Sequence, residues 1–240
     1  MNPSPQSMAI PKTRRLSASL RREAIALSVL PLFAQKGLDG VSTCELAESC
    51  GVSEALIFRH FPSKVALYNE MLRRYCEFIE PVSVRVDNLP PSTETLVRLV
   101  HGFVYRIVVK ESTKGYQIMR LFYRSFVDDG EFASKFLRST RLRKIRACFH
   151  SSLAEARRRG DALPLATEPH NLFWFVQHTA SMGCLIRLPP KRAVRYVGAL
   201  DTAVADMVRY ALRGVGLTEG ALGRYATADK FRRWRRDSAL

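Results

Sequence analysis

The sequence predicts an all-α fold built in two parts. Apolar residues recur every three or four positions along most of the 240 residues, and strand-like alternation is scarce. Ser before and Gly after several of these stretches are the expected helix caps. The chain is 47% hydrophobic and 25% charged, as in soluble globular proteins. We expect a flexible basic arm over residues 1–17, a three-helix head over 18–80, a larger helical domain over 81–218 and a basic tail over 219–240.

The first helix of the head is expected around Ile25, Val29 and Phe33, which share one helical face. Pro31 lies inside this pattern, and its missing N–H should bend or interrupt the helix at a cost of about 3 kcal/mol. Basic residues just before the helix form an arm that can reach a flanking phosphate or the minor groove; a disordered tail explains residues 1–16 equally well. The arm consists of Lys12, Arg14, Arg15, Arg21 and Arg22.

Residues 42–64 predict two short helices joined by a tight turn. Ser42 followed by Glu45 is a capping-box pattern, and Gly51 can take the left-handed conformation that ends the first helix. Ser53 can cap the second helix, which Pro62 ends. Ser63 can then cap a third helix. This order of signals can place a compact helix in the major groove of DNA.

Two runs in this segment resemble a known family, namely Gly51-Val52-Ser53 and the eight residues from Ile57 to Lys64. They closely resemble the DNA-binding head of TetR-family transcriptional regulators, and the resemblance covers roughly residues 20–80. It implies a helix-turn-helix head followed by an α-helical ligand-binding and dimerisation domain. The implied function is that of a ligand-responsive repressor that binds a palindromic operator in double-stranded DNA as a homodimer. By position, the residues expected to contact DNA are Ser42, Thr43, Cys44, Ser53, Glu54, Ala55, Leu56, Phe58, Arg59, His60 and Lys64.

The chemistry of these side chains fits that expectation. Arg59 and Lys64 can neutralise phosphate, and His60 can donate a hydrogen bond to it. Glu54 can accept a hydrogen bond from a cytosine amino group, and Leu56 can rest against a thymine methyl. For Glu54 and Arg59, a charge that simply stays in solvent is the alternative.

Two positions depart from the family pattern. Phe58 stands where Tyr is usual, which removes one hydroxyl contact to phosphate, and Leu56 stands where a small polar residue is commoner. Ile57 between them is expected to point inward. The exposed side of this helix is therefore expected to be more apolar than is usual in the family.

After Pro81 the pattern stays helical. Residues 82–91 look like a linker, Ser92 begins a helix, and further helices are expected over about 116–127 and 132–159. A solvated charged face explains the basic residues of the 132–159 helix, and contact with an anionic ligand or flanking DNA is the alternative. These basic residues are Lys135, Arg138, Arg141, Arg143, Lys144 and Arg146.

Two helices predicted over 168–188 and 191–213 suit a subunit contact. Apolar and small residues recur every three or four positions along one stripe of each helix. This spacing favours the packing of two helices at an interaxial angle near +20°. The alternative is that both stripes face the core of their own subunit. The stripes consist of Leu172, Val176, Thr179, Ala180, Gly183 and Ile186, and of Ala193, Val197, Leu200, Val204, Met207 and Ala211.

The family resemblance also implies an effector pocket in the helices after residue 90, which are rich in aromatic residues. Aromatic walls suit a small apolar or amphipathic ligand, and neighbouring arginines would tolerate a carboxylate or phosphate. Aromatic residues at helical spacing also form ordinary core. The candidate ligand contacts are Phe103, Arg106, Arg120, Tyr123, Phe126, Trp174 and His178.

Other classes of function find little support. The sequence contains no Gly-rich phosphate loop and no paired metal-ligand spacing, so neither an enzyme nor a cofactor or metal is expected. Five cysteines without CxxC pairing indicate reduced thiols in a cytoplasm, and a redox or metal sensor is the alternative. No apolar run is long enough to cross a bilayer or to form a signal-peptide core, which also favours a cytoplasmic protein.

The net charge of +16 suits a polyanionic partner, but most of it lies outside the head. Residues 1–80 hold 10 Lys and Arg against 8 Asp and Glu, whereas residues 81–240 hold 28 against 14. An alternative function is therefore a non-specific, nucleic-acid-coating or architectural protein that uses its basic C-terminal half. The tail from Lys230 to Arg236 alternates aromatic and cationic groups, which suits a disordered segment, an acidic membrane surface or a nucleic acid.

Overall fold

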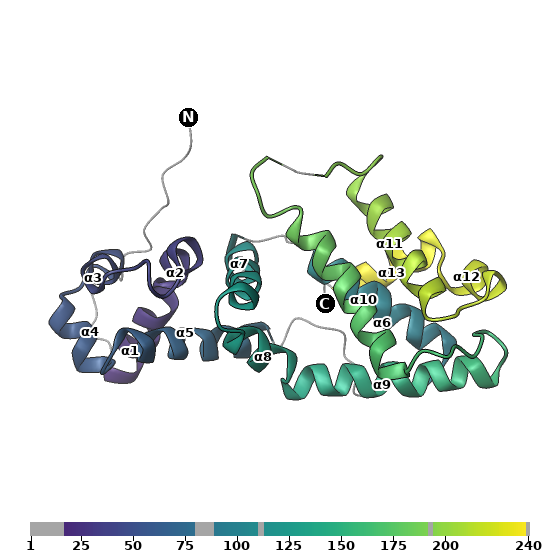
Figure 1. Cartoon of the computed structure of the whole chain (residues 1–240), viewed down its shortest axis with the longest axis horizontal. Helices are drawn as coiled ribbons and strands as arrows, with labels where there is room; N and C mark the ends of the chain where they lie inside the picture. The colour runs from purple at the N-terminus through teal and green to yellow at the C-terminus, as the bar shows by residue number, and fades with distance from the viewer. Residues whose placement is uncertain (1–16, 80–88, 110–112, 192–193, 239–240) are drawn as a thin grey trace. The chain divides into compact units, whose positions relative to one another are not determined.

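The structure is a computed structural model that describes residues 17–79, 89–109, 113–191 and 194–238. These residues form helices and no strand, so the predicted all-α class is confirmed (Figure 1). The basic residues Lys12, Arg14 and Arg15 of the predicted arm lie outside the described residues, as do residues 82–88 of the linker predicted over 82–91. Of the helices that are described, none combines the length and the apolar character needed to cross a membrane.

Internal contacts divide the chain into two compact units. The first comprises Met1–Pro81 with Ser112–Phe136, and the second comprises Val82–Glu111 with Leu137–Leu240. Residues 112–136, which the sequence places in the second domain, therefore pack with the head instead. The helices of the first unit are α1 (Ala18–Ser28), α2 (Leu30–Lys36), α3 (Thr43–Cys50), α4 (Glu54–His60), α5 (Lys64–Ile79), α7 (Thr113–Val127) and α8 (Glu131–Leu137), the last of which ends at the boundary.

The first helix of the head is interrupted, as Pro31 predicts. Helix α1 ends at Ser28, Val29 is the capping residue shared by the two helices, and α2 begins at Leu30 with Pro31 in its first turn. A proline in that turn costs no hydrogen bond, because the first amides of a helix have no carbonyl partner. Arg21 and Arg22 lie inside α1, so their assignment to an arm before the first helix is wrong.

Helix α7 packs against α2 (Figure 1). Gly37 ends α2 with φ of 75°, a left-handed conformation that L side chains rarely adopt, and its N–H donates to the Phe33 carbonyl at 2.8 Å. The Arg124 guanidinium of α7 occupies the space that a Cβ at Gly37 would need, with its Cζ 2.5 Å from that position. A larger residue at position 37 would therefore be strained by its positive φ and would also require Arg124 to move.

The second unit is built around α6 (Thr93–Val108), which contacts each of the other helices of the unit (Figure 1). Leu96, Val97, Val100 and Val104 of α6 are at most 2% exposed. The other helices are α9 (Thr140–Arg158), α10 (Pro169–Leu185), α11 (Leu200–Gly214), α12 (Glu219–Tyr225) and α13 (Ala228–Ser238).

Two helix predictions in this region are wrong in part. The helix expected over 132–159 is two helices, α8 and α9, because Ser139 begins α9 by accepting a hydrogen bond from the Leu142 amide. The helix expected over 191–213 begins only at Leu200. Gly198 just before it has φ of 84°, which is incompatible with a continuous right-handed helix.

The stripes predicted to form a subunit contact lie mostly in the unit's own core. Val176 and Ala180 of α10 and Val204 of α11 are at most 4% exposed. A Cβ at Gly183 would lie 2.8 Å from Met207 Cε, so the small residue does admit a close helix, but that helix is α11 of the same chain. Helical periodicity identified most of these buried residues, which face their own unit and not a second subunit. Val197 of the second stripe is an exception, since it is 96% exposed, and Ala193 lies outside the described residues.

Asp161 joins three segments of the second unit. It is 6% exposed, its carboxylate accepts a hydrogen bond from the Thr93 hydroxyl at 2.7 Å and pairs with Arg224, and its carbonyl accepts from the Thr218 amide at 2.9 Å. The start of α6, the connection after α9 and helix α12 are thereby held together. A buried carboxylate is tolerated here because each of its oxygens has a donor.

The basic C-terminal segment, which the sequence treats as a tail, is instead a packed helix. Phe231 and Trp234 of α13 are each 4% exposed. The His101 ring of α6 stacks on Phe231 with a centroid distance of 4.3 Å and an interplanar angle of 12°. The aromatic residues of the segment therefore belong to the protein core and are not available to a membrane surface.

Stability should fall on acidification because of His101. Burial, and then Arg235, lower the pKa of His101 to about 4, whereas Asp201 opposes the shift. An unfolded histidine titrates near about 6.5, so below that pH the unfolded chain takes up a proton that the folded chain refuses. We expect the free energy of unfolding to drop by up to roughly 3 kcal/mol between about pH 6.5 and pH 4. Urea unfolding followed by Trp fluorescence measures this change. The variant His101→Phe should remove it, and an unchanged pH dependence in that variant would contradict the assignment.

Candidate nucleic-acid interface

Helix α3 starts with the predicted capping box. The Glu45 amide donates to Ser42 Oγ at 3.2 Å, and the Ser42 amide donates to Glu45 Oε2 at 2.9 Å. Lys36 pairs with the other oxygen of the Glu45 carboxylate. The hydrogen bond from Lys36, followed by the one from the Ser42 backbone, lowers the pKa of Glu45 to about 2. The carboxylate therefore stays ionised at neutral pH, as this cap requires.

The turn between α3 and α4 has the predicted geometry. Gly51 ends α3 at φ 64° and ψ 35°, and its N–H and that of Val52 bond back to carbonyls of the last turn. Ser53 then caps α4 by accepting a hydrogen bond from the Leu56 amide at 3.2 Å. Ile57 is 2% exposed and turned inward as predicted, so the opposite side of α4 faces outward.

That outward side carries most of the residues expected to contact DNA. Glu54, Ala55, Phe58 and Arg59 are exposed, and Phe58 retains 46% of its accessible surface. Ser42, Cys44 and Ser53 are also exposed, whereas Thr43, Leu56, His60 and Lys64 are partly buried.

Thr43 and Glu54 are brought together across the turn. The Thr43 hydroxyl donates a hydrogen bond of 2.6 Å to Glu54 Oε2. The hydroxyl thereby orients the carboxylate at the start of α4, and the second carboxylate oxygen remains an acceptor. Their spacing of eleven residues gave no signal of this contact in the sequence.

Cys44 lies on the same surface as a neutral thiol. Its Sγ donates to Glu48 Oε1 at 3.7 Å, and the negative charge of Glu48, followed by burial, raises the pKa of the Cys44 thiol. At neutral pH this group is therefore a weak hydrogen-bond donor, not a reactive thiolate.

Two cations brace the segment from behind. Lys64 Nζ donates to the Val41 carbonyl at 2.9 Å, which leaves two of its three N–H donors for other partners. Arg22 Nη1 donates to the His60 carbonyl at 2.5 Å, and its guanidinium lies 4.5 Å from the centre of the Phe61 ring. Arg22 thus holds the C-terminal end of α4, a role that its position 38 residues away did not suggest.

His60 is neutral at physiological pH. Burial, and then the charges of Arg59, Arg21 and Arg22, lower the pKa of His60 below its usual value near about 6.5. A neutral imidazole has one N–H donor, so His60 can still donate one hydrogen bond, without adding a positive charge.

The residues predicted to bind an effector are divided between the two units. Arg120, Tyr123 and Phe126 belong to α7 of the first unit. In the second unit, Phe103 and Trp174 both contact Phe173, at ring-centroid distances of 5.8 and 5.4 Å. The two remaining candidates, Arg106 and His178, lie on α6 and α10 of the same unit.

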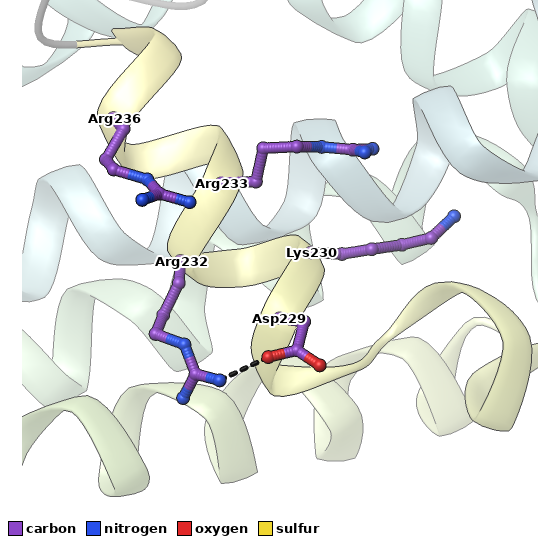
Figure 2. Close-up of a pocket in the computed structure, with 5 residues that line it drawn as sticks. All are labelled: Asp229, Lys230, Arg232, Arg233 and Arg236. Carbon is purple, nitrogen blue, oxygen red and sulfur yellow. Dashed lines mark hydrogen bonds and ion pairs between the residues drawn. The ribbon is translucent and has the colours of Figure 1, made fainter.

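Two surface hollows of the second unit are lined by other residues. One of about 250 Å³ is lined by charged residues of α13 (Figure 2). The other, of about 400 Å³, lies along α11 and α12. Neither contains a predicted effector contact, so the assignment of these seven residues to ligand binding stays a prediction.

The short helix α4 follows the supporting helix α3 and a glycine turn. It is capped at its start, its inner side is buried at Ile57, and its outer side exposes Arg59. This arrangement defines a helix-turn-helix DNA-binding protein. Residues 30–71, which hold both helices of the motif, match the family model described as bacterial regulatory proteins, tetR family. Within these residues the head of the chain therefore resembles the DNA-binding region of the TetR family. The members of this family are regulators of transcription and not enzymes.

The relatives in sequence match about a third of the chain. The nucleoid occlusion factor SlmA of Salmonella paratyphi B is 39% identical over 85 residues, which cover 33% of this chain and 41% of SlmA. SlmA of Salmonella newport matches with the same values. The chain thus spans less than half the length of these relatives.

Similar solved structures cover most of the chain. AibR in complex with isovaleryl coenzyme A and operator DNA has a TM-score of 0.59 at 18% identity, over 82% of this chain and all of AibR. The ketosteroid transcriptional regulator KstR2 of Mycobacterium tuberculosis has a TM-score of 0.55 at 17% identity, over 85% of this chain and 98% of KstR2. At such identities the likeness establishes the fold of a helix-turn-helix head with a helical second part.

The brace formed by Arg22 should matter for stability at one end of α4. We expect Arg22→Met, which keeps the aliphatic stem, to cost about 1–2 kcal/mol because it removes the charged hydrogen bond and the cation–ring interaction. Hydrogen exchange of the amides at the end of α4 should accelerate in this variant. The neighbouring substitution Arg21→Met is the control, and equal exchange in both variants would contradict a specific brace.

Proposed function

We propose that this chain is a ligand-responsive repressor of transcription that binds a palindromic operator as a homodimer. The observation that carries the proposal is the fixed presentation of α4, which is capped by Ser53 at one end and braced by Arg22 at the other. Its outward side combines a cation with both a polar and an apolar group. Such a surface can bind phosphate and also distinguish base edges. A protein of this kind would act in the cytoplasm, where its operator lies.

Each residue of the interface receives a role in this proposal. Arg59 contacts a phosphate, with Lys64 supplying a second cation. Glu54, oriented by Thr43, accepts from a cytosine amino group, and Leu56 contacts a thymine methyl. The other contacts to backbone or base edges come from the exposed residues of the motif, namely Ser42, Cys44, Ser53, Ala55 and Phe58, and from His60.

A homodimer is proposed through the exposed side of α10. Phe175, Met182 and Leu185 are 55%, 56% and 38% exposed, and with the exposed His178 they recur every three or four residues. This strip lies opposite the buried stripe of the same helix. Exposed apolar strips of this kind mark protein interaction sites, and helix pairing would bury this one.

Further exposed apolar side chains occur next to α10 in sequence and on α11. Val194, Tyr196 and Val197 lie between the two helices, and Tyr210 of α11 is 71% exposed. A twofold dimer would place two copies of α4 about 34 Å apart, one helical turn of DNA, so that both halves of a palindrome are read.

Ligand control is proposed to act through α7. Because α7 packs on α2 in the same compact unit as the helix-turn-helix, a ligand that moves α7 would also move the head. A ligand that favours an arrangement of the two heads unsuited to successive major grooves lowers DNA affinity. The fold is shared with AibR, solved with isovaleryl coenzyme A, and with the ketosteroid regulator KstR2, which supports a small amphipathic effector.

Removal of Arg59 should separate sequence-specific from general DNA binding. DNA fragments selected from a random pool by the purified protein would be measured by fluorescence anisotropy. We expect Arg59→Ala to weaken binding to the selected palindrome by about tenfold or more, because the phosphate that Arg59 contacts is then no longer neutralised and Lys64 alone remains. The control is Arg73→Ala on α5, an exposed arginine paired with Glu70 in the same unit.

Two outcomes would contradict the proposal. If no palindrome is enriched and all duplexes bind alike with a steep salt dependence, the chain is a nucleic-acid-coating protein. If Arg59→Ala and Arg73→Ala have equal effects, α4 does not contact the DNA.

The dimer contact can be tested by placing charges on the exposed strip of α10. The double substitution Phe175→Asp and Met182→Asp should convert dimers to monomers in sedimentation experiments, since paired carboxylates would be buried without partners. It should also reduce affinity for the full palindrome. Leu163→Asp is the matched control, because Leu163 is a comparably exposed residue, at 58%, outside α10. A dimer that survives the double substitution would exclude this strip as the contact.

A further inference from the structure

Four charged side chains of α13 recur at positions that share one helical face. Asp229, Arg232, Arg233 and Arg236 are spaced by three, one and three residues, and with Lys230 they line the hollow of about 250 Å³. Figure 2 shows these side chains arrayed along the helix, with Arg232 and Asp229 paired. Among the residues that the structure describes, all those that line the hollow are charged. The site is therefore unlike the mostly apolar pockets that bind organic effectors.

The helix that carries these groups is fixed in place. Phe231 and Trp234 bury its inner side, while Lys230 pairs with Glu94 of α6 at 2.8 Å and Arg235 pairs with Asp201 of α11. These two cations serve to attach the helix. The orientation of the remaining arginines is thus set by the core of the second unit.

The outward arginines, in contrast, have weak partners. Arg232 pairs with Asp229 on the same helix, and the two side chains are 61% and 86% exposed. Arg233 lies 3.7 Å from the Glu94 oxygen that already binds Lys230. No described acidic side chain pairs with Arg236, which is exposed. Exposed ion pairs of this kind contribute at most about 1 kcal/mol, so an external anion can replace them.

We propose that Arg232, Arg233 and Arg236 form a second, sequence-independent contact to the phosphate backbone of duplex DNA. Arg232 to Arg236 spans about 6 Å of helix, and successive phosphates of one strand are about 3.4 Å apart along the duplex axis, so two phosphates fit. The guanidinium fork matches phosphate oxygens in a bidentate way. Residues 81–240 also hold 28 basic against 14 acidic residues, which adds a favourable long-range field.

This contact would act independently of base recognition by α4. The head would bind the operator, and α13 would bind any DNA duplex. The second contact would raise the affinity for DNA and leave the preference for the operator unchanged. The chain can also hold two DNA segments at once. The proposal thus gives a role to three of the basic residues that lie outside the nearly neutral head.

The test uses the full chain and a duplex of about 30 base pairs that lacks the selected palindrome. Arg232, Arg233 and Arg236 are changed together to Gln, which removes charge and keeps polar side chains of similar length. The matched control changes Arg143 and Arg158 of α9 and its capping residue Arg159 to Gln. These arginines are also exposed, so the control removes the same net charge from the same unit. Thermal unfolding checks that both variants are folded.

We expect the α13 variant to bind the duplex about tenfold more weakly at low salt. The slope of log affinity against log salt should fall by roughly 2, which is about 0.9 for each of the two phosphates that the variant no longer neutralises. The control should change both values much less. Equal effects of the two variants would overturn the proposal, since only total charge would then matter. The proposal would also be overturned if the α13 variant binds DNA normally but no longer binds vesicles containing phosphatidylserine. That result would make this face of α13 a membrane contact.

Combining the α13 substitutions with Arg59→Ala distinguishes a failure of this proposal from a failure of the function proposed for the head. In the Arg59→Ala background, binding to the non-palindromic duplex should persist and should still depend on the three arginines of α13. Conversely, the α13 variant should retain the preference of the wild-type chain for the selected palindrome. Loss of that preference through the α13 substitutions would overturn an independent contact.

Discussion

The burial of Ile57 and Phe61 behind α4 is the packing interaction on which the DNA-binding surface depends. Both side chains are at most 2% exposed, and they anchor a helix of only seven residues, too short to be stable in isolation. Because the helix is held from behind, its outward side chains keep fixed directions. Arg22 adds to this by joining α1 to the end of α4, so the first helix of the head also controls the pose of α4.

The motif could be predicted from sequence because its determinants are local. The capping box of Ser42 and Glu45, the left-handed Gly51 and the cap of Ser53 each act over three or four residues, and all three occur as expected. Contacts between distant residues gave no such signal. The bond from Thr43 to Glu54 and the brace from Arg22 depend on how the helices cross, which spacing along the chain does not encode.

The errors after residue 90 share a physical origin. Periodicity shows which residues of a helix are on one face, but it does not show what covers that face, and the stripes of α10 and α11 are covered by their own unit. The C-terminal segment was misjudged because its many charges conceal Phe231 and Trp234, which are enough to dock an amphipathic helix. The division of the predicted effector residues between two units also follows from packing, since α7 associates with the head.

The hydrogen bond between Thr43 and Glu54 has an evolutionary consequence. One carboxylate oxygen is occupied by the hydroxyl, so the direction in which the other oxygen points depends on the residue at position 43. In the proposed role of Glu54 as a base contact, a change at either position would alter the base preference that the other one can express. The two positions would therefore form a single unit of operator choice, and divergence toward a new binding sequence would require paired replacements in α3 and α4.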